Sequence, residues 1–217
     1  MAATVLTGCA SSTSAVTDSV RLLMAPPAAD TAVLNPDLRY LRVTSNKNVA
    51  MLALGYVDAM PQPDTQVWYS AKKETVRLWR GRIIGTAGLK VDWRSVRFGE
   101  VPSWRSAIAG NAHYQRSRDV MPDYLVDVRE EVLIRPVAPP KSSAFIGPSA
   151  TDLHWFEETT TTHNRATALP VARFAVDLSG ADERVVYSEQ CLSATLCMTL
   201  QDWSSGNSPS STTSLLR

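Results

Sequence analysis

Three cysteines are the residues of this chain whose type and spacing point most directly to chemistry. Cys9 closes the stretch Leu6-Thr7-Gly8-Cys9, in which one apolar and two small residues precede a thiol. This order has the form of a bacterial lipobox, where the thiol receives a diacylglycerol group and becomes the first residue of the mature protein. Each buried acyl methylene contributes ~0.8 kcal/mol, so the sequence predicts anchoring to a membrane through a lipid on Cys9.

The residues before and after Cys9 predict a signal-peptide remnant and a flexible tether. Residues 1–8 lack the basic start and the full apolar stretch of a signal peptide, so we interpret them as a truncated remnant of one. Residues 9–17 are small and polar, which predicts a lipidated flexible tether. Ala10 stands where an Asp would favour inner-membrane retention, which favours the outer membrane, with the folded part on its periplasmic face. The alternative is a chance cysteine in a flexible amino terminus.

Cys191 and Cys197 are six positions apart near the other end of the chain. Export would place both thiols in an oxidising compartment, where a disulfide is the natural pairing. A straight strand would separate them by about 20 Å, whereas a disulfide needs Cα atoms ~4.4–6.8 Å apart, so the chain must turn between them. Two buried thiols or a metal-binding pair are the alternatives, although this spacing is not that of a zinc knuckle.

Motifs of nucleophilic catalysis are weak. The stretch Ser70-Ala71-Lys72-Lys73 matches the S-x-x-K of penicillin-interacting enzymes, but that chemistry places the serine at the start of a helix and needs a K-T-G element, which the sequence lacks. A surface hairpin is the better interpretation. The sequence has no G-x-S-x-G elbow and no phosphate-binding loop.

Metal-capable side chains occur around His154, Glu157, Glu158 and His163. The threonine run 159–162 disfavours the helix that would bring such ligands together, so we expect a charged strand edge or loop and no metal or other cofactor.

Paired carboxylates for glycoside hydrolysis are present only as residue types, at Asp123, Asp127, Glu157 and Glu158. Catalysis would require a separation of ~5 or ~6.5–9.5 Å between two of them, which the sequence cannot supply. We therefore predict no catalytic residues.

Six tryptophans offer flat apolar faces that could stack on sugar rings. Trp79, Trp68 and Trp155 are the candidates, and Trp79 is the strongest because strand alternation places it on one face with Arg77. The alternative for each is packing within the core.

The elements that must position these residues are strands. Of 217 residues, 44% are hydrophobic and 20% charged, as in an ordinary folded domain. Short segments of strand character, separated by turn residues, predict a mainly β antiparallel sandwich or partly open barrel. The segments are 38–44, 49–57, 65–70, 75–80, 81–88, 93–98, 124–137, 172–178, 184–189 and 195–203. The apolar run 49–57 predicts a central strand buried on both faces.

We expect a single β domain over residues 18–203, with a short N-terminal helix near residues 14–24, a helical turn near 103–109, and a loop at 136–149. The Ser/Thr-rich residues 204–217 should be disordered. No stretch approaches the ~20 apolar residues that span a bilayer, so attachment must be covalent or peripheral.

Charge excludes one class of partner. Lys and Arg total 22 and Asp and Glu 21, giving a net charge of +1, so no nucleic-acid partner is expected. The charges in segments 77–82 and 127–131 are interleaved along strands, which predicts solvated strand faces.

A set of segments spread from about residue 38 to 203, together with the lipobox, resembles the YjbF/GfcB family of group 4 capsule and exopolysaccharide lipoproteins. The stretches that carry this resemblance are Gly55-Tyr56-Val57, Val67-Trp68-Tyr69-Ser70, Gly81-Arg82-Ile83-Ile84-Gly85-Thr86-Ala87-Gly88-Leu89, Asp92-Trp93, Arg118-Asp119-Val120-Met121-Pro122, Trp155-Phe156-Glu157-Glu158 and Glu189-Gln190-Cys191-Leu192-Ser193 running through Cys197.

The resemblance implies an outer-membrane lipoprotein of mainly β fold, needed for polysaccharide production or export. Its implied partners are a large outer-membrane β-barrel and a periplasmic protein of the export system. The hypothesis is a non-enzymatic accessory that acts through contacts with a barrel partner, with polymer, or with both. The alternatives are a periplasmic carbohydrate-active enzyme, a hydrolase or lyase, and a polysaccharide-binding module.

Overall fold

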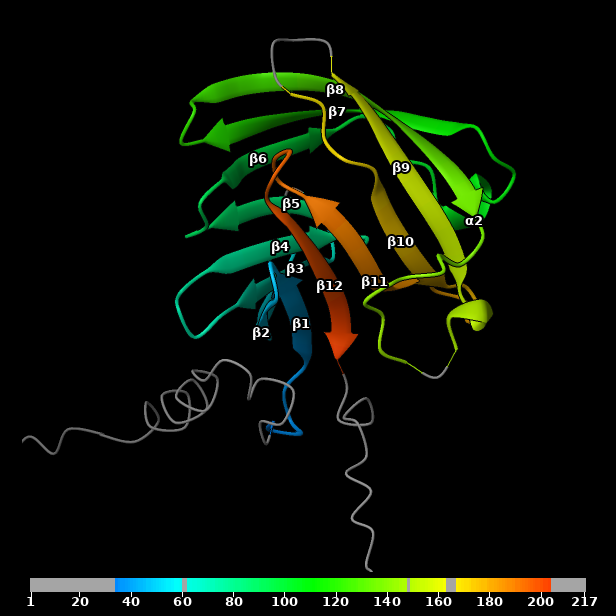
Figure 1. The fold of residues 1–217 in the computed structure, drawn as a ribbon, viewed down its shortest axis with the longest axis horizontal. Helices are drawn as coiled ribbons and strands as arrows, with labels where there is room; N and C mark the ends of the chain where they lie inside the picture. Colours follow the sequence, from blue (N-terminus) through cyan, green and yellow to red (C-terminus); the bar gives the residue numbers. More distant parts are fainter. Residues whose placement is uncertain (1–33, 60–61, 148, 163–166, 204–217) are drawn as a thin grey trace, which may run out of the picture.

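The computed structural model describes residues 34–59, 62–147, 149–162 and 167–203 (Figure 1). Its strands are β1 (Tyr40–Ser45), β2 (Asn48–Asp58), β3 (Thr65–Tyr69), β4 (Thr75–Trp79), β5 (Arg82–Ala87), β6 (Asp92–Phe98), β7 (Ala112–Met121), β8 (Leu125–Val137), β9 (His154–Thr162), β10 (Ala172–Asp177), β11 (Arg184–Cys191) and β12 (Cys197–Trp203). Two short helical segments, α2 (Trp104–Ala107) and the 3-10 turn η2 (Ala150–Asp152), accompany them. The prediction of a mainly β protein is confirmed.

All twelve described strands form one antiparallel sheet that curls into a nearly closed barrel. Their order is β5-β4-β3-β2-β1-β12-β11-β10-β9-β8-β7-β6. Strands that are adjacent in the sheet are therefore consecutive in sequence, with the exception of β1 and β12. The first and last strands pair with each other, with Tyr40 opposite Trp203. Of the two predicted architectures, the structure shows the partly open barrel.

The opening of the barrel lies between β5 and β6, the two edge strands of the sheet. Hydrogen bonds from side chains connect these strands in place of backbone pairing. Trp93 donates its backbone N–H to the Thr86 hydroxyl over 3.1 Å, and that hydroxyl donates to Asp92 over 2.9 Å. Asp92 also accepts from the backbone of Gly88 and Leu89 in the connecting turn. These bonds satisfy polar groups at two strand edges that would otherwise lack partners.

Two hydrophobic clusters fill the barrel. One, around Trp68 and Trp93, draws mainly on β1–β6 and β12. The other, around Trp104 and Phe156, draws on α2 and β7–β10. Burial of each large side chain contributes about 1.5–3 kcal/mol, so the aliphatic and aromatic residues of these two clusters together are the main source of the barrel's stability.

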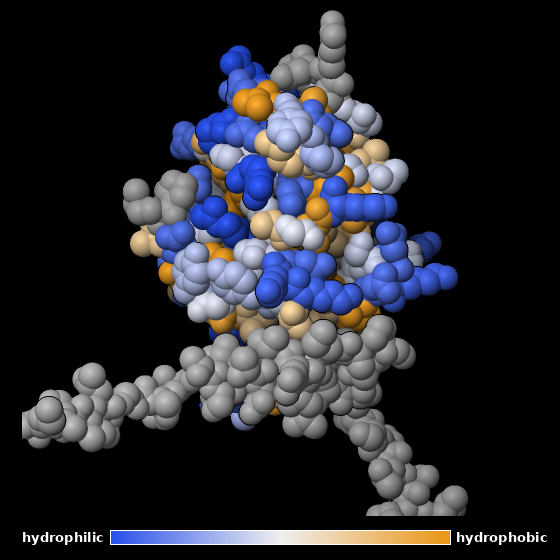
Figure 2. Space-filling model, turned by 90° about the vertical axis from the view of Figure 1, so that its left-hand side faces the viewer, coloured by the Kyte–Doolittle hydropathy of each residue, from blue (hydrophilic) through white to orange (hydrophobic). Residues whose placement is uncertain are grey.

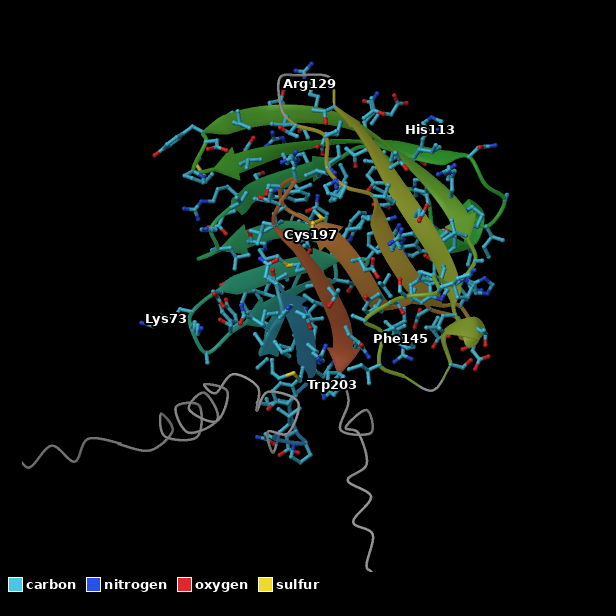
Figure 3. The ribbon with its side chains drawn as sticks, in the orientation of Figure 1. Lys73, His113, Arg129, Phe145, Cys197 and Trp203 are labelled. Carbon is cyan, nitrogen blue, oxygen red and sulfur yellow. A yellow bond between two sulfur atoms is a disulfide. The ribbon has the colours of Figure 1, made fainter. Side chains whose placement is uncertain are left out.

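The connection between β8 and β9 lies over the outside of the barrel. Its Phe145 packs against Trp155 and Tyr187, whose rings belong to β9 and β11 (Figure 3). The backbone N–H of Ala144 donates to the Tyr187 hydroxyl, and Ile146 exchanges hydrogen bonds with Gln201. This cover explains why β9 and β11 bury residues on both faces.

The expectation that residues 49–57 form a strand buried on both faces is wrong. β2 occupies this segment, but Tyr56 and Val57 are each 51% exposed. A register shift between Leu54 and Tyr56, around Gly55, interrupts the pairing with β3, and the Tyr69 ring of that strand lies against Gly55. The outer face of the barrel here meets solvent.

Short helices are minor, as expected. Ser103 caps α2 by accepting the Ser106 N–H over 3.1 Å. None of the helices in the described part of the chain has the length and hydrophobicity that a bilayer crossing requires. The predicted helix at residues 14–24, Cys9 with its tether, and the tail at 204–217 lie outside the described residues.

One side of the molecule is shown in space-filling form in Figure 2. Hydrophilic side chains cover most of it, and hydrophobic side chains appear between them in separate small areas. This alternation is what strands with one face toward solvent produce.

Candidate functional site

The candidate site is a cleft of about 790 Å³ at the end of the barrel where β1 begins and β12 ends, which we call the end cleft. Its described lining comes from β1, β3, β4, β11 and β12, from the start of α2, and from the β10–β11 loop. Cavities of ~300–1,000 Å³ with a few polar groups are typical of small-molecule sites. The end cleft therefore has the size of a ligand site.

The rim of the end cleft combines both signs of charge. Its described lining holds four arginines and four aspartate or glutamate residues. Arg39 lies 3.9 Å from Asp202, and both side chains are partly exposed. Among the described residues, Asp64 and Asp182 are exposed and have no hydrogen-bond or ion-pair partner. The rim thus offers guanidinium and carboxylate groups in equal number, and the carboxylates of Asp64 and Asp182 are free.

One wall of the end cleft is held in place by Glu183. Its carboxylate accepts the backbone N–H groups of Trp104 and Arg105 over 2.9 and 2.8 Å, at the start of α2. Arg105 in turn donates to the carbonyl of Gly180. These bonds join α2 to the β10–β11 loop, so the two elements form one rigid wall.

The β10–β11 loop is also fixed at its start. The Asp177 carboxylate accepts from the Ser179 hydroxyl over 2.6 Å and from Arg184 over 3.0 Å. The hydrogen bonds from Ser179, followed by the one from Arg184, lower the pKa of Asp177 to about 2. Asp177 is therefore ionised throughout the physiological pH range, and the loop keeps this anchor.

Trp68 lies in the lining of the end cleft and is 1% exposed. Its indole Nε1 is buried and has no hydrogen-bond partner among the described residues. Two other buried tryptophans do have acceptors: the indole N–H of Trp93 donates to the carbonyl of Leu192, and that of Trp155 donates to the carbonyl of Ala150. A buried donor without an acceptor costs about 1–3 kcal/mol, and among the described side chains Trp68 shares this feature only with Arg82 and Thr162.

Behind the end cleft, a buried ion pair crosses the barrel interior. Arg82 on β5 lies 2.8 Å from Glu158 on β9, and the two side chains are 1% and 3% exposed. The Tyr114 hydroxyl donates to the same carboxylate over 3.0 Å, and the Arg82 guanidinium lies 4.0 Å from the centre of the Trp104 ring. Burial, and then the charge of Glu158, raise the pKa of Tyr114, so its hydroxyl stays protonated.

A second buried charge cluster lies further inside. Glu130 accepts from Arg116 over 2.8 Å and from Arg118 over 2.9 Å, and its side chain is fully buried. Both guanidinium groups lie about 5 Å from the Trp93 ring centre. Each of these three charged side chains thus has an opposite charge or an aromatic face beside it.

The expectation of solvated charges in segments 77–82 and 127–131 is wrong for Arg82 and Glu130. Alternation along β7 carries the signal that sequence reasoning missed. Tyr114, Arg116, Arg118 and Val120 are spaced by two and share the inward face. Because a strand has only two faces, charges in phase with buried residues must enter the core.

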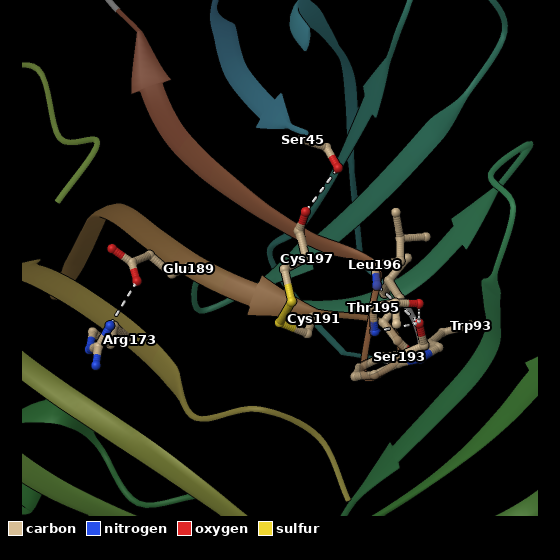
Figure 4. The surroundings of a disulfide bond; sticks show 10 residues. Ser45, Trp93, Arg173, Glu189, Cys191, Ser193, Thr195, Leu196 and Cys197 are labelled. Atoms are coloured by element: carbon tan, nitrogen blue, oxygen red, sulfur yellow. Dashed lines mark hydrogen bonds and ion pairs between the residues drawn. A yellow bond between two sulfur atoms is a disulfide. The ribbon is translucent and has the colours of Figure 1, made fainter. Parts of the chain in front are cut away.

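Cys191 and Cys197 are joined by a disulfide, at the last residue of β11 and the first of β12 (Figure 4). Their Cα atoms are 3.9 Å apart, and the chain turns between them as the sequence requires. The turn is held by Leu192 N–H donating to Leu196 over 2.8 Å, and by the Trp93 indole donating to Leu192. The disulfide closes the hairpin at the end of the barrel opposite the end cleft.

Replacing both cysteines with serine is expected to lower the free energy of unfolding by about 2 kcal/mol, because a short closed loop restricts the unfolded chain only modestly. Urea unfolding of the variant and the oxidised protein measures this difference. Reduction of the wild type should reproduce it, and an unchanged midpoint under reduction would contradict the prediction.

The weaker sequence candidates lie apart from the end cleft. Ser70 is in the β3–β4 turn, where its hydroxyl donates to Glu74 over 2.8 Å, and Lys73 points outward from this hairpin (Figure 3). His154 is exposed, whereas Glu158 is buried. Within the described residues, no group of three or more His, Cys, Asp or Glu side chains could hold a metal ion.

The three tryptophans proposed for sugar stacking are separated by the fold. Trp68 lines the end cleft, whereas Trp155 is 2% exposed beneath Phe145. Trp79 is half-buried, with its ring 5.3 Å from that of Phe98 and 4.9 Å from the Arg80 guanidinium. Sugar stacking by these rings stays a prediction.

Comparison with known proteins adds a family and a fold. The hypothetical lipoprotein YmcC from Escherichia coli (K12) has a similar structure, with a TM-score of 0.65 and 16% sequence identity, over 90% of this chain and 99% of that chain. At this identity the likeness shows the fold alone. No curated protein sequence matches the chain.

Residues 24–201 match the family described as "Group 4 capsule polysaccharide lipoprotein gfcB, YjbF". This range covers most of the chain and nearly the whole barrel, so the resemblance found in the sequence is confirmed. The protein belongs to the group 4 capsule polysaccharide lipoprotein family.

Proposed function

We propose that the protein is a non-enzymatic outer-membrane lipoprotein that assists the production or export of a capsule or exopolysaccharide. It is held at the periplasmic face by a lipid on Cys9 and acts through contacts with envelope proteins of the export system, among them an outer-membrane β-barrel. The observation that carries this proposal is the family match over residues 24–201.

The interior of the barrel supports an accessory role. Its buried carboxylates, Glu130 and Glu158, are each bound by arginine, so they serve to hold strands together. A general acid for glycoside hydrolysis must reach the oxygen of the bond that is cleaved, whereas these two side chains are at most 3% exposed and are occupied by arginine. Of the carboxylates at the end cleft, Asp64 and Asp182 are exposed, and Glu183 is occupied by the backbone N–H groups of Trp104 and Arg105.

A deletion strain of the source organism tests the proposal. Wild-type protein expressed from the native locus should restore surface polysaccharide and fractionate with the outer membrane. A Cys9→Ser variant should be released from the membrane and fail to restore the polymer, whereas Ser11→Ala should behave as wild type. Unchanged polysaccharide in the deletion strain would overturn the proposal.

The partner is tested separately in the same strains. Cross-linking in intact cells followed by purification of the wild-type protein should recover a β-barrel protein of the outer membrane. The Cys9→Ser variant should recover much less of it, because it no longer shares a membrane with that partner. Recovery of no envelope protein would refute this part of the proposal.

A further inference from the structure

We infer that the end cleft binds a neutral oligosaccharide, an inference that rests on the proposed function and names the ligand class of that site. Its volume of about 790 Å³ suits a short oligosaccharide. Three features of the described lining favour this class of ligand. They are the balance of charges, a buried donor without an acceptor, and walls that are held by hydrogen bonds.

Charge balance favours a neutral ligand over a polyanion. The described lining contains as many arginines as acidic residues, so its formal charge is zero. Sugar hydroxyls both donate and accept hydrogen bonds, and they can donate to carboxylates such as Asp64 and Asp182 and accept from guanidinium groups such as Arg39. Two of the arginines already pair with carboxylates, Arg39 with Asp202 and Arg184 with Asp177, whereas Asp64 and Asp182 have no partner among the described residues. A carboxylated polymer would therefore meet repulsion from these two acidic residues that the paired arginines offset only in part.

Trp68 supplies an unsatisfied donor. Its buried Nε1 has no acceptor among the described residues, although the residue lines the end cleft. Because this N–H is buried, a sugar oxygen reaches it only when a side chain of the lining moves. The Arg39 guanidinium lies 5.8 Å from the centre of the Trp68 ring and its side chain is 53% exposed, so it can move, and a ring or hydroxyl oxygen of a sugar would then provide the missing acceptor. A ligand of purely apolar character would leave the N–H without an acceptor.

The walls of the end cleft are rigid before any ligand arrives. Glu183 joins the β10–β11 loop to α2. Gln190 donates to the carbonyl of Gly81 and to the Ser188 hydroxyl, both over 2.8 Å, and so ties two further lining residues together. A site that is already ordered loses less conformational entropy when it binds.

The test uses the full chain, labelled with ¹⁵N, and its indole N–H signals in solution NMR. The probes are oligosaccharides released from the surface polysaccharide of the source strain and separated by anion exchange into neutral and acidic fractions. Absence of one indole signal in Trp68→Phe identifies that of Trp68. We expect the neutral fraction to shift this signal and the acidic fraction to bind more weakly.

Variants separate the contributions of the two kinds of group. Trp68→Phe should weaken binding about five-fold, the effect of one neutral hydrogen bond. Asp64→Asn with Asp182→Asn should weaken it about ten-fold, since bonds to charged groups are stronger. This pair is exposed, so folding is preserved even if Trp68→Phe disturbs the core. The matched control is Asp123→Asn in the β7–β8 hairpin, which should change nothing.

Tighter binding of the acidic fraction, binding of neither fraction, or shifts confined to residues outside the end cleft would each overturn the inference. The deletion experiment reports on the proposed function independently. If polysaccharide is lost on deletion while no fraction binds, the inference fails and the proposed function stands. If polysaccharide is unchanged on deletion, the proposed function itself fails.

Discussion

Replacing Glu130 with alanine is expected to lower the free energy of unfolding by about 3–5 kcal/mol, the typical cost of breaking a buried ion pair. The change leaves two guanidinium groups, on Arg116 and Arg118, without the carboxylate that binds both. Urea unfolding followed by circular dichroism at neutral pH measures the loss. Because most domains have only about 5–15 kcal/mol in total, a partly unfolded population is expected at 37 °C.

Glu131 is the matched control because it is the next residue on β8 and is exposed. Its replacement by alanine should lower the free energy of unfolding by about 1 kcal/mol at most, the usual limit for an exposed charged side chain that has a partner. Similar losses for the two variants would contradict the assignment of Glu130 to the interior.

A companion variant separates the need for charge from the need for volume. Replacing Arg116 and Arg118 with methionine and Glu130 with leucine removes all three charges and keeps an apolar filling of similar size. We expect this triple variant to be about as stable as the wild type or more stable, because desolvation of the charges offsets much of their attraction.

Replacing Glu158 with alanine is expected to lower the free energy of unfolding by about 3–5 kcal/mol as well, because Arg82 would remain charged and buried. The loss should also disturb the end cleft, since the Arg82 guanidinium lies against the Trp104 ring at the start of α2. A shifted Trp104 indole signal in the NMR spectrum checks this second effect.

Two controls isolate the interaction. Glu157 precedes Glu158 on β9 but points to the other face, where it pairs with Arg173 over 3.0 Å, so Glu157→Ala should cost at most about 1 kcal/mol. Tyr114→Phe removes only the hydroxyl that donates to Glu158 and should cost about 1.5–3 kcal/mol. Equal losses for Glu157→Ala and Glu158→Ala would refute the predicted difference.

Local features of the fold could be predicted from the sequence. The turn at Asn46 and Lys47, both with positive φ, lies between two predicted strands, and the segment 65–70 became β3 at Thr65–Tyr69. Alternation and turn residues act over a few positions, so the sequence displays them directly. The disulfide is a local feature as well, because a turn within the six positions between Cys191 and Cys197 is enough to bring the two thiols together.

Long-range features could not be predicted in the same way. The pairing of β1 with β12 joins the two ends of the barrel, and no short pattern records which distant strands meet. The sequence predicted a strand over residues 172–178, and alternation in a strand gives one face to the core. In β10, Ala175 on the opposite face from Phe174 is also buried, in a cluster with residues of the β8–β9 connection.

The end cleft was beyond sequence reasoning for the same reason. Asp64, Trp68, Arg105 and Glu183 come from three separate parts of the chain, and only the curled sheet with its loops brings them to one cleft. Of the four, the sequence had singled out Trp68, as a candidate for sugar stacking. What these side chains can bind depends on where the fold places them. The unpaired indole N–H of Trp68, for example, can be recognised only once its burial is known.

The pairing of β1 with β12 has a consequence for how the chain acquires its shape. Each hairpin from β1 to β12 can form from neighbouring segments as they emerge, but the barrel cannot close until its last strand has been delivered. Until then β1 presents an unpaired edge and the inward aromatic residues face water, a state prone to aggregation. A chaperone that shields such edges during transit would therefore act on this protein late, just before β12 arrives.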